Sequence, residues 1–171
     1  AGCFDGMTTR QFAEWAGDSF IKAFAFEPDS RSIPTIEQNM SDLIQNGQFK
    51  LHNTGLYHEK TKLYFNESGV RSGSCLSEMG KTVVPVESID GVLKGEKISF
   101  IKMDIEGAEL NALKGASESI CRWKPKLAIS LYHKDQDIVE IPLYLLEIMP
   151  EYQFYIRHYT TAMGETVLYA V

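Results

Sequence analysis

Short apolar runs that alternate with helical patterns are the feature of this sequence that most restricts its fold. Residues 23–26 (AFAF) are apolar on both faces, as a strand is when helices cover both sides of its sheet. Residues 98–104 and 126–131 are further apolar runs, and the segments 8–17 and 33–44 carry apolar side chains at helical spacing. This alternation predicts an α/β fold with a mostly parallel, doubly wound sheet.

The remaining segments complete that prediction. Residues 138–149 have a helical pattern that Pro150 closes, and residues 152–158 and 166–171 flank a loop that contains Gly164. The last two segments predict a C-terminal antiparallel hairpin. Shorter strands are expected at residues 49–52, 61–66 and 82–87. The last two are separated by a loop rich in Gly and Ser at residues 68–80.

Composition excludes several classes of protein. The 171 residues correspond to one domain, residues 1–171, and the net charge of −6 argues against general affinity for nucleic acid or anionic lipid. No apolar run reaches the length that spans a bilayer, so no membrane partner is expected. Three widely spaced cysteines predict reduced thiols and a cytoplasmic location.

The turn at residues 1–6 (AGCFDG) raises a question about the first strand. A nucleotide-binding sheet of this type normally begins with a strand that leads into a glycine-rich turn, and here the turn comes first. We therefore expect an N-terminally incomplete domain whose first strand is missing. That strand would pair between the strand ending at Phe26 and the strand ending at Met103.

Ligands of open α/β sheets bind beyond the carboxyl ends of the strands, which directs attention to two N-terminal features. Gly2, Asp5 and Gly6 belong to the first turn, where glycines allow a close approach of the backbone to a ligand. Glu27 closes a strand 22 residues after Asp5, and a carboxylate there can accept hydrogen bonds from both ribose hydroxyls. The structural alternatives are a tight turn and a charge at a helix start.

Charged residues follow the two later strands. In KMDIEGAE, residues 102–109, strand alternation places Lys102 and Asp104 on one side, so Lys102 needs a partner among Asp104, Glu106 and Glu109. His133 follows the next strand, where it is a candidate general base. The structural alternatives are ion pairs with acids at a helix N-terminus and a capping or surface histidine.

Taken together, these residues resemble the FkbM family of S-adenosylmethionine-dependent methyltransferases over nearly the whole chain. The most specific stretch is FIKMDIEGAELNALKGA, and AGCFDGMTT, AFEPD, HNTGL and SLYHKDQD are similar to other blocks of the family. The resemblance implies a Rossmann-like class I methyltransferase that uses S-adenosylmethionine and methylates a hydroxyl of a sugar or secondary metabolite. It further implies that Gly2, Asp5 and Gly6 lie by the methionine end, that Glu27 holds the ribose and that Asn53 flanks the adenine.

Methyl transfer from a sulfonium is an in-line displacement that needs positioning and a base for the hydroxyl proton. His133 and Asp104 are the candidates, and we favour His133 because Asp104 can instead be tied to Lys102 or to the cofactor. No metal is expected; the alternative is a divalent ion held by Asp104 with Asp135 or Asp137.

Two other classes of function compete with the enzyme. A noncatalytic nucleotide-binding module would account for the glycine turn but not for the combination of Lys102, Asp104 and His133. An interaction scaffold would use the loop 68–80 and the terminal hairpin as partner surfaces. For the enzyme, the expected partner is a small-molecule or glycan acceptor, and the sequence leaves the oligomeric state open.

Overall fold

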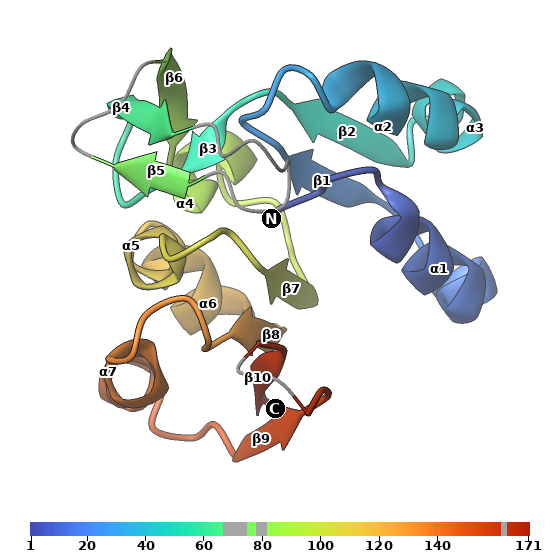
Figure 1. Cartoon of the computed structure of the whole chain (residues 1–171). Helices are drawn as coiled ribbons and strands as arrows, with labels where there is room; N and C mark the ends of the chain where they lie inside the picture. Colours follow the sequence, from blue (N-terminus) through green and yellow to red (C-terminus); the bar gives the residue numbers. More distant parts are fainter. Residues whose placement is uncertain (67–74, 78–81, 162–163) are drawn as a thin grey trace.

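The computed structural model describes residues 1–66, 75–77, 82–161 and 164–171, which form a mixed α/β fold (Figure 1). The helical elements are α1 (Met7–Ala16), the 3-10 helix η1 (Gly17–Ser19), α2 (Ile33–Asn39), α3 (Ser41–Gln45), α4 (Ile89–Leu93), α5 (Glu109–Lys114), α6 (Ser117–Trp123) and α7 (Asp137–Ile148). The strands are β1 (Ala23–Phe26), β2 (Phe49–His52), β3 (Gly55–Leu56), β4 (Thr61–Asn66), β5 (Cys75–Ser77), β6 (Thr82–Glu87), β7 (Phe100–Met103), β8 (Lys126–Ser130), β9 (Phe154–His158) and β10 (Thr166–Ala170). Most of the predicted loop 68–80 lies outside the described residues.

The strands of the described residues form three separate groups, one parallel pair and two mixed sheets, rather than one mostly parallel sheet. β1 pairs in parallel with β2, and β7 pairs in parallel with β8. The predicted C-terminal hairpin is confirmed, since β9 and β10 are antiparallel and β10 continues the sheet beside β8. The third group has the order β3-β6-β4-β5, and the predicted strands 61–66 and 82–87 are its antiparallel pair β4 and β6.

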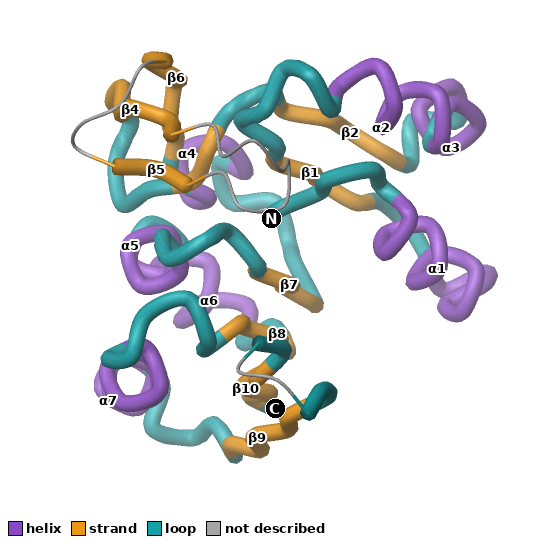
Figure 2. The backbone as a smooth tube through the Cα atoms, in the orientation of Figure 1, coloured by secondary structure: helices purple, strands orange, loops and turns teal. Residues whose placement is uncertain are grey.

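Residues 1 and 2 lie between β1 and β7, which are not paired with each other in the described sheets (Figure 2). The amino group of Ala1 donates to the Lys102 carbonyl at 2.8 Å, and the Asp104 N–H donates to the Ala1 carbonyl at 3.3 Å. On the other side, the Gly2 N–H donates to the Phe26 carbonyl at 3.2 Å. The first turn therefore connects the ends of the two strands that carry the candidate acids. The upstream strand itself stays a prediction.

A continuous apolar core fixes β7 and β8 against the C-terminal helices. Its fully buried members come from β7, β8, β10 and from α5, α6 and α7: Met103, Leu113, Ile120, Leu127, Ile129, Ile141, Leu145 and Leu168. Because close-packed interiors resist small displacements, the residues that follow β7 and β8 are held in defined positions. A smaller cluster around Ile36, Met40 and Phe49 supports β1 and β2 in the same way.

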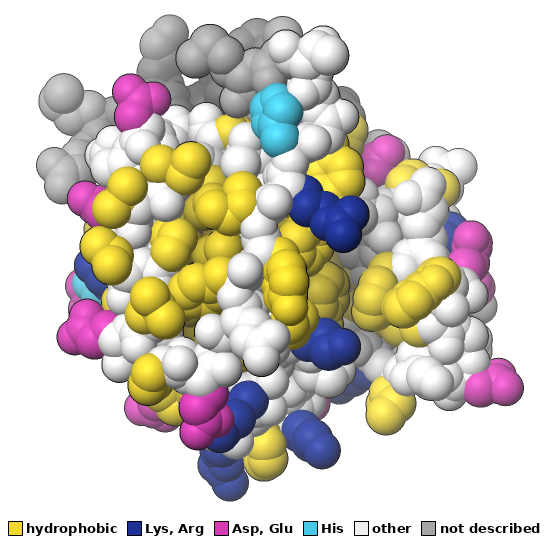
Figure 3. Space-filling view, turned by 90° about the horizontal axis from the view of Figure 1, so that it is seen from below, with side chains coloured by type: hydrophobic (Ala, Val, Ile, Leu, Met, Phe, Trp, Pro, Cys, Tyr) yellow, Lys and Arg dark blue, Asp and Glu magenta, His cyan; other side chains and the backbone are white. Residues whose placement is uncertain are grey.

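Helix α7 is apolar on more than its buried face. Ile141 and Leu145 pack into the core, while Ile138, Val139 and Leu143 are exposed. In the view of Figure 3, hydrophobic side chains gather in a broad patch on this side of the molecule. The helix thus departs from the usual amphipathic pattern of a surface helix. None of the described helices is long and apolar enough to cross a membrane.

The two N-terminal helices differ in detail from their predicted segments. The helix predicted over residues 8–17 begins one residue earlier, at Met7, after Gly6 with φ +84°, and the Met7 N–H donates to Asp5 Oδ1 at 3.0 Å. The single helix predicted over residues 33–44 is divided into α2 and α3 at Met40, whose φ of −111° and ψ of 13° are not helical. Tertiary packing of the fully buried Met40 side chain accompanies this break.

Candidate functional site

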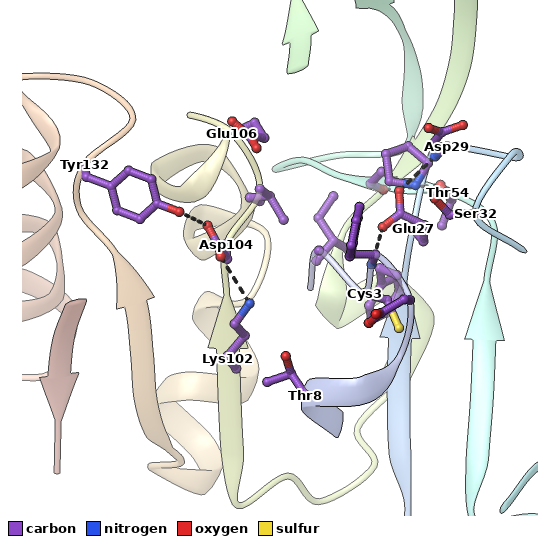
Figure 4. A pocket seen from close by; sticks show the side chains of 18 of the residues that line it. Cys3, Thr8, Glu27, Asp29, Ser32, Thr54, Lys102, Asp104, Glu106 and Tyr132 are labelled. Carbon is purple, nitrogen blue, oxygen red and sulfur yellow. Dashed lines mark hydrogen bonds and ion pairs between the residues drawn. The ribbon is translucent and has the colours of Figure 1, made fainter. Parts of the chain in front are cut away.

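A cavity of about 310 Å³ lies at the carboxyl ends of β1 and β7 (Figure 4). Its floor is the first turn, and its two walls carry the predicted acids Glu27 and Asp104. Short segments from distant parts of the chain complete the lining: residues 2–5, 26–29, 54–56 and 104–106, with Ser32, Lys102, Tyr132 and Glu165 among the others. A cavity therefore lies beyond the strand ends where the sequence predicts the ligand.

Gly2 permits the close contact between the first turn and β7. Its φ is +73°, and a Cβ atom at this position would lie 1.8 Å from the Asp104 carbonyl oxygen. Gly6 has a different role, because a Cβ there would approach Met40 Cγ at 3.0 Å and the residue does not line the cavity. Asp5 lines the cavity and also caps α1 through its side chain.

The Glu27 carboxylate is held by backbone N–H groups. Its Oε2 accepts from the Phe4 N–H at 2.9 Å, and its Oε1 accepts from the Asp29 N–H at 3.0 Å. The side chain is buried but lines the cavity. Each carboxylate oxygen can accept about two hydrogen bonds, so the group retains capacity for the hydroxyls of a ligand.

Asn53 points away from this cavity. Its Nδ2 donates to the Glu27 carbonyl at 2.8 Å, and its Oδ1 accepts from Ser30 Oγ at 3.0 Å. The following residues, 54–56, line the cavity in its place. Asn53 thus supports the backbone beneath Glu27, and its contact with an adenine stays a prediction. The sequence carried no signal that distinguished Thr54 from Asn53.

Asp104 lies on the opposite wall between two side chains. Lys102 Nζ is 3.3 Å from its Oδ2, which confirms the predicted pairing of Lys102, and the Tyr132 hydroxyl donates to its Oδ1 at 3.0 Å (Figure 4). Burial alone would raise the pKa of Asp104. The charges of Lys102 and His133 and the bond from Tyr132 outweigh burial and lower that pKa. Asp104 is therefore ionised near neutral pH.

His133 is enclosed behind Asp104. Its Nδ1 is 2.8 Å from Oε1 of the fully buried Glu109, which also accepts from the Ile105 N–H at 2.8 Å. Burial would lower the pKa of His133, but the hydrogen bond and charge of Glu109, with the charges of Asp104 and Glu106, raise it. His133 does not line the cavity, whereas Asp104 and Glu106 do.

Glu106 and Glu109 occupy different positions beside Asp104. The sequence pattern alone did not distinguish these positions. Glu106 lines the cavity, adopts φ 56° and has a pKa raised by burial. Glu109 begins α5 and points inward to His133 rather than into solvent. Positive φ at a residue with a side chain is uncommon and often marks a functional segment.

Comparison with known proteins identifies the family to which the chain belongs. Residues 7–156 match the model of the methyltransferase FkbM domain. The chain belongs to the FkbM methyltransferase family. This confirms the resemblance predicted from KMDIEGAE and its neighbouring blocks.

A solved structure of the FkbM methyltransferase from Methylobacillus flagellatus KT is similar over the whole chain, with 29% sequence identity and a TM-score of 0.83. The FkbM-family chain described here covers 42% of that protein's length. A putative rRNA-methylase from Clostridium thermocellum shares the fold, with 13% identity, a TM-score of 0.50 and coverage of 98% of this chain and 80% of that one. A search among curated proteins gave no match.

Proposed function

We propose that this FkbM-family chain transfers a methyl group from S-adenosylmethionine to a hydroxyl oxygen of a sugar or secondary metabolite. The observation that carries the proposal is the position of Glu27. Its carboxylate ends a parallel strand, is oriented by two backbone N–H groups and faces Asp104 across one cavity. In a class I methyltransferase with a doubly wound sheet, this is the place of the ribose of the cofactor.

The lining of the cavity suits a cofactor of this kind. The Glu27 carboxylate can accept further hydrogen bonds from the two ribose hydroxyls. Gly2, which has no side chain, allows the backbone of the first turn to lie close to the cofactor. Acidic side chains outnumber the lysine in the described lining, which favours a positively charged sulfonium. We therefore expect the ribose beside Glu27 and the sulfonium near Asp104.

The protein's contribution to the transfer is positioning and proton removal. The acceptor oxygen forms a bond to the methyl carbon while the carbon–sulfur bond breaks, and the hydroxyl proton leaves to a base. Asp104 meets the cavity directly, and His133 lies behind it with Nε2 3.5 Å from Asp104 Oδ1. These two residues remain the candidates for the base, and Lys102 and Tyr132 orient the Asp104 carboxylate.

Calorimetric titration with S-adenosylhomocysteine tests the cofactor proposal. We expect binding to the wild type and an affinity about 100-fold weaker for Glu27→Gln, since two hydrogen bonds to a charged group contribute about 3 kcal/mol. Glu37→Gln is the matched control, because Glu37 is exposed on α2 outside the cavity. Absence of binding to the wild type would contradict the cofactor. Equal affinities for the two variants would contradict the ribose role of Glu27.

Transfer of a labelled methyl group then separates the enzyme from a noncatalytic module. Sugars and hydroxylated metabolites would be screened with labelled S-adenosylmethionine, and we expect label on an oxygen of at least one acceptor. A chain that binds S-adenosylhomocysteine but labels none of a broad panel would favour the noncatalytic nucleotide-binding alternative.

A further inference from the structure

Four acidic or imidazole side chains meet at the ends of β7 and β8: Asp104, Glu106, Glu109 and His133. One atom each from Asp104, Glu109 and His133 lies within 4.8 Å of the others. Glu106 Oε2 and Asp104 Oδ1 are both 3.5 Å from His133 Nε2. The group is larger than one ion pair and opens on the cavity only through Asp104 and Glu106.

Two atoms of this group are buried without a hydrogen-bond partner. They are His133 Nε2, on a side chain that is 8% exposed, and Glu109 Oε2, on a side chain that is fully buried. A buried polar atom that lacks a partner costs roughly 1–3 kcal/mol. In the neutral imidazole, the carboxylate acceptor Glu109 Oε1 favours the proton on His133 Nδ1, which leaves the Nε2 lone pair directed at the two other carboxylates.

We propose that a divalent cation of the Mg²⁺ or Mn²⁺ class binds between His133 Nε2, Asp104 and Glu106. Carboxylate oxygens are preferred ligands of such ions, and imidazole is an accepted partner. Two ligands at right angles around an ion with bonds of about 2.1 Å lie about 3 Å apart, close to the 3.5 Å observed here. Glu109 is the positioning residue, since a carboxylate on the second nitrogen commonly orients a metal-bound histidine.

The catalytic consequence rests on the proposed function, whereas cation binding does not. An ion at this wall would bind the acceptor hydroxyl and lower its pKa. The hydroxyl oxygen then forms the bond to the methyl carbon, the electrons of the carbon–sulfur bond go to sulfur, and the proton passes to water. In this arrangement His133 Nε2 is a ligand and not the base.

The cation site can be tested without methyl donor or acceptor. The metal-free full chain is titrated with MnCl₂, and binding is monitored by calorimetry and by electron paramagnetic resonance. We expect one bound Mn²⁺ per chain. Asp104→Asn and His133→Gln should abolish saturable binding, and Glu109→Gln should weaken it roughly tenfold. Glu140→Gln is the control, because Glu140 is an exposed acid on α7 outside this group and its loss should leave the affinity unchanged.

Broadening of resonances by Mn²⁺ gives a second measurement that needs no variant. In the wild type, the ring signals of His133 and Tyr132 should broaden at substoichiometric Mn²⁺, while those of His158 on β9 should not. Absence of saturable binding at millimolar Mn²⁺, or equal affinity of His133→Gln and Glu140→Gln, would overturn the proposal. Because S-adenosylhomocysteine binding is measured separately, failure of the cation site and failure of the proposed cofactor site give different results.

Discussion

The two walls of the cavity hold their carboxylates in different ways. Glu27 is fixed by the N–H groups of Phe4 and Asp29, so its orientation comes from the backbone. Asp104 is fixed by the side chains of Lys102 and Tyr132, with His133 behind it. The first arrangement is suited to binding neutral hydroxyls, and the second is suited to a change of charge, since its members respond to one another electrostatically.

The two histidines near these walls show the same contrast. His52, at the end of β2, stacks on Phe26 with ring centroids 5.0 Å apart, and burial together with the charge of Lys50 lowers its pKa. The pKa of His133 is raised despite burial, because of Glu109, Asp104 and Glu106. Two histidines of the same chain therefore have pKa values shifted in opposite directions by their neighbours.

Substitution of Asp104 or His133 should have the largest effect of the changes considered, and that effect should be on the rate of methyl transfer. Asp104→Asn and His133→Ala should each lower the rate roughly 10²–10⁴-fold, with the affinity for S-adenosylhomocysteine little changed. Steady-state kinetics with an acceptor found in the screen would measure this. A collapse for Asp104→Asn with a nearly normal rate for His133→Ala would assign the proton step to Asp104 alone. Mild losses in both would mean that positioning carries the transfer.

Removal of the Glu27 side chain should affect stability as well as binding. Glu27→Ala leaves the N–H groups of Phe4 and Asp29 without their acceptor, so we expect a loss of about 3 kcal/mol in the free energy of unfolding. Denaturant unfolding measures the loss. A normal unfolding curve would show that the backbone contacts contribute little.

Gly2→Ala tests the contact that joins the two walls. The substituted Cβ would meet the Asp104 carbonyl oxygen at 1.8 Å, whereas Gly17, also at positive φ, has nothing within 4 Å. Both substitutions carry the strain of a left-handed residue, about 1–2 kcal/mol, and only Gly2→Ala should also weaken S-adenosylhomocysteine binding. Parallel melting curves and titrations of the two variants would reveal the difference; identical behaviour would refute the role of the contact.

The pH dependence of the histidines is the finest test of the comparison. NMR titration should place the His52 pKa below the usual histidine value and the His133 pKa above it. The His52 contribution to stability is present above its unfolded pKa and declines as pH falls toward its folded pKa. The His133 contribution is present below its unfolded pKa and is lost as pH rises through its folded pKa. Shifts in the same direction for both would contradict the contrast between the walls.

Local patterns in the sequence determined much of this protein. Strand alternation and the acids at strand ends placed Glu27, Lys102 and Asp104 beside one another, and these residues line one cavity. The hairpin of β9 and β10 followed from its turn. The block KMDIEGAE indicated the family, and the match over residues 7–156 confirms that assignment. These features were accessible because each depends on residues that are near one another in the chain.

Only the tertiary structure decided which distant residues meet. The contact of His133 with Glu109 spans 24 positions, and that of Phe4 with Glu27 spans 23. Periodicity gives the face on which a side chain lies but not the partner that another strand or helix brings to it. For the same reason, the sequence pattern could not predict that Asn53 points away from the cavity or that His133 is enclosed behind Asp104. Asn53 is held by the Glu27 carbonyl and by Ser30. The burial and charges around His133 depend instead on packing across β7, β8 and α5.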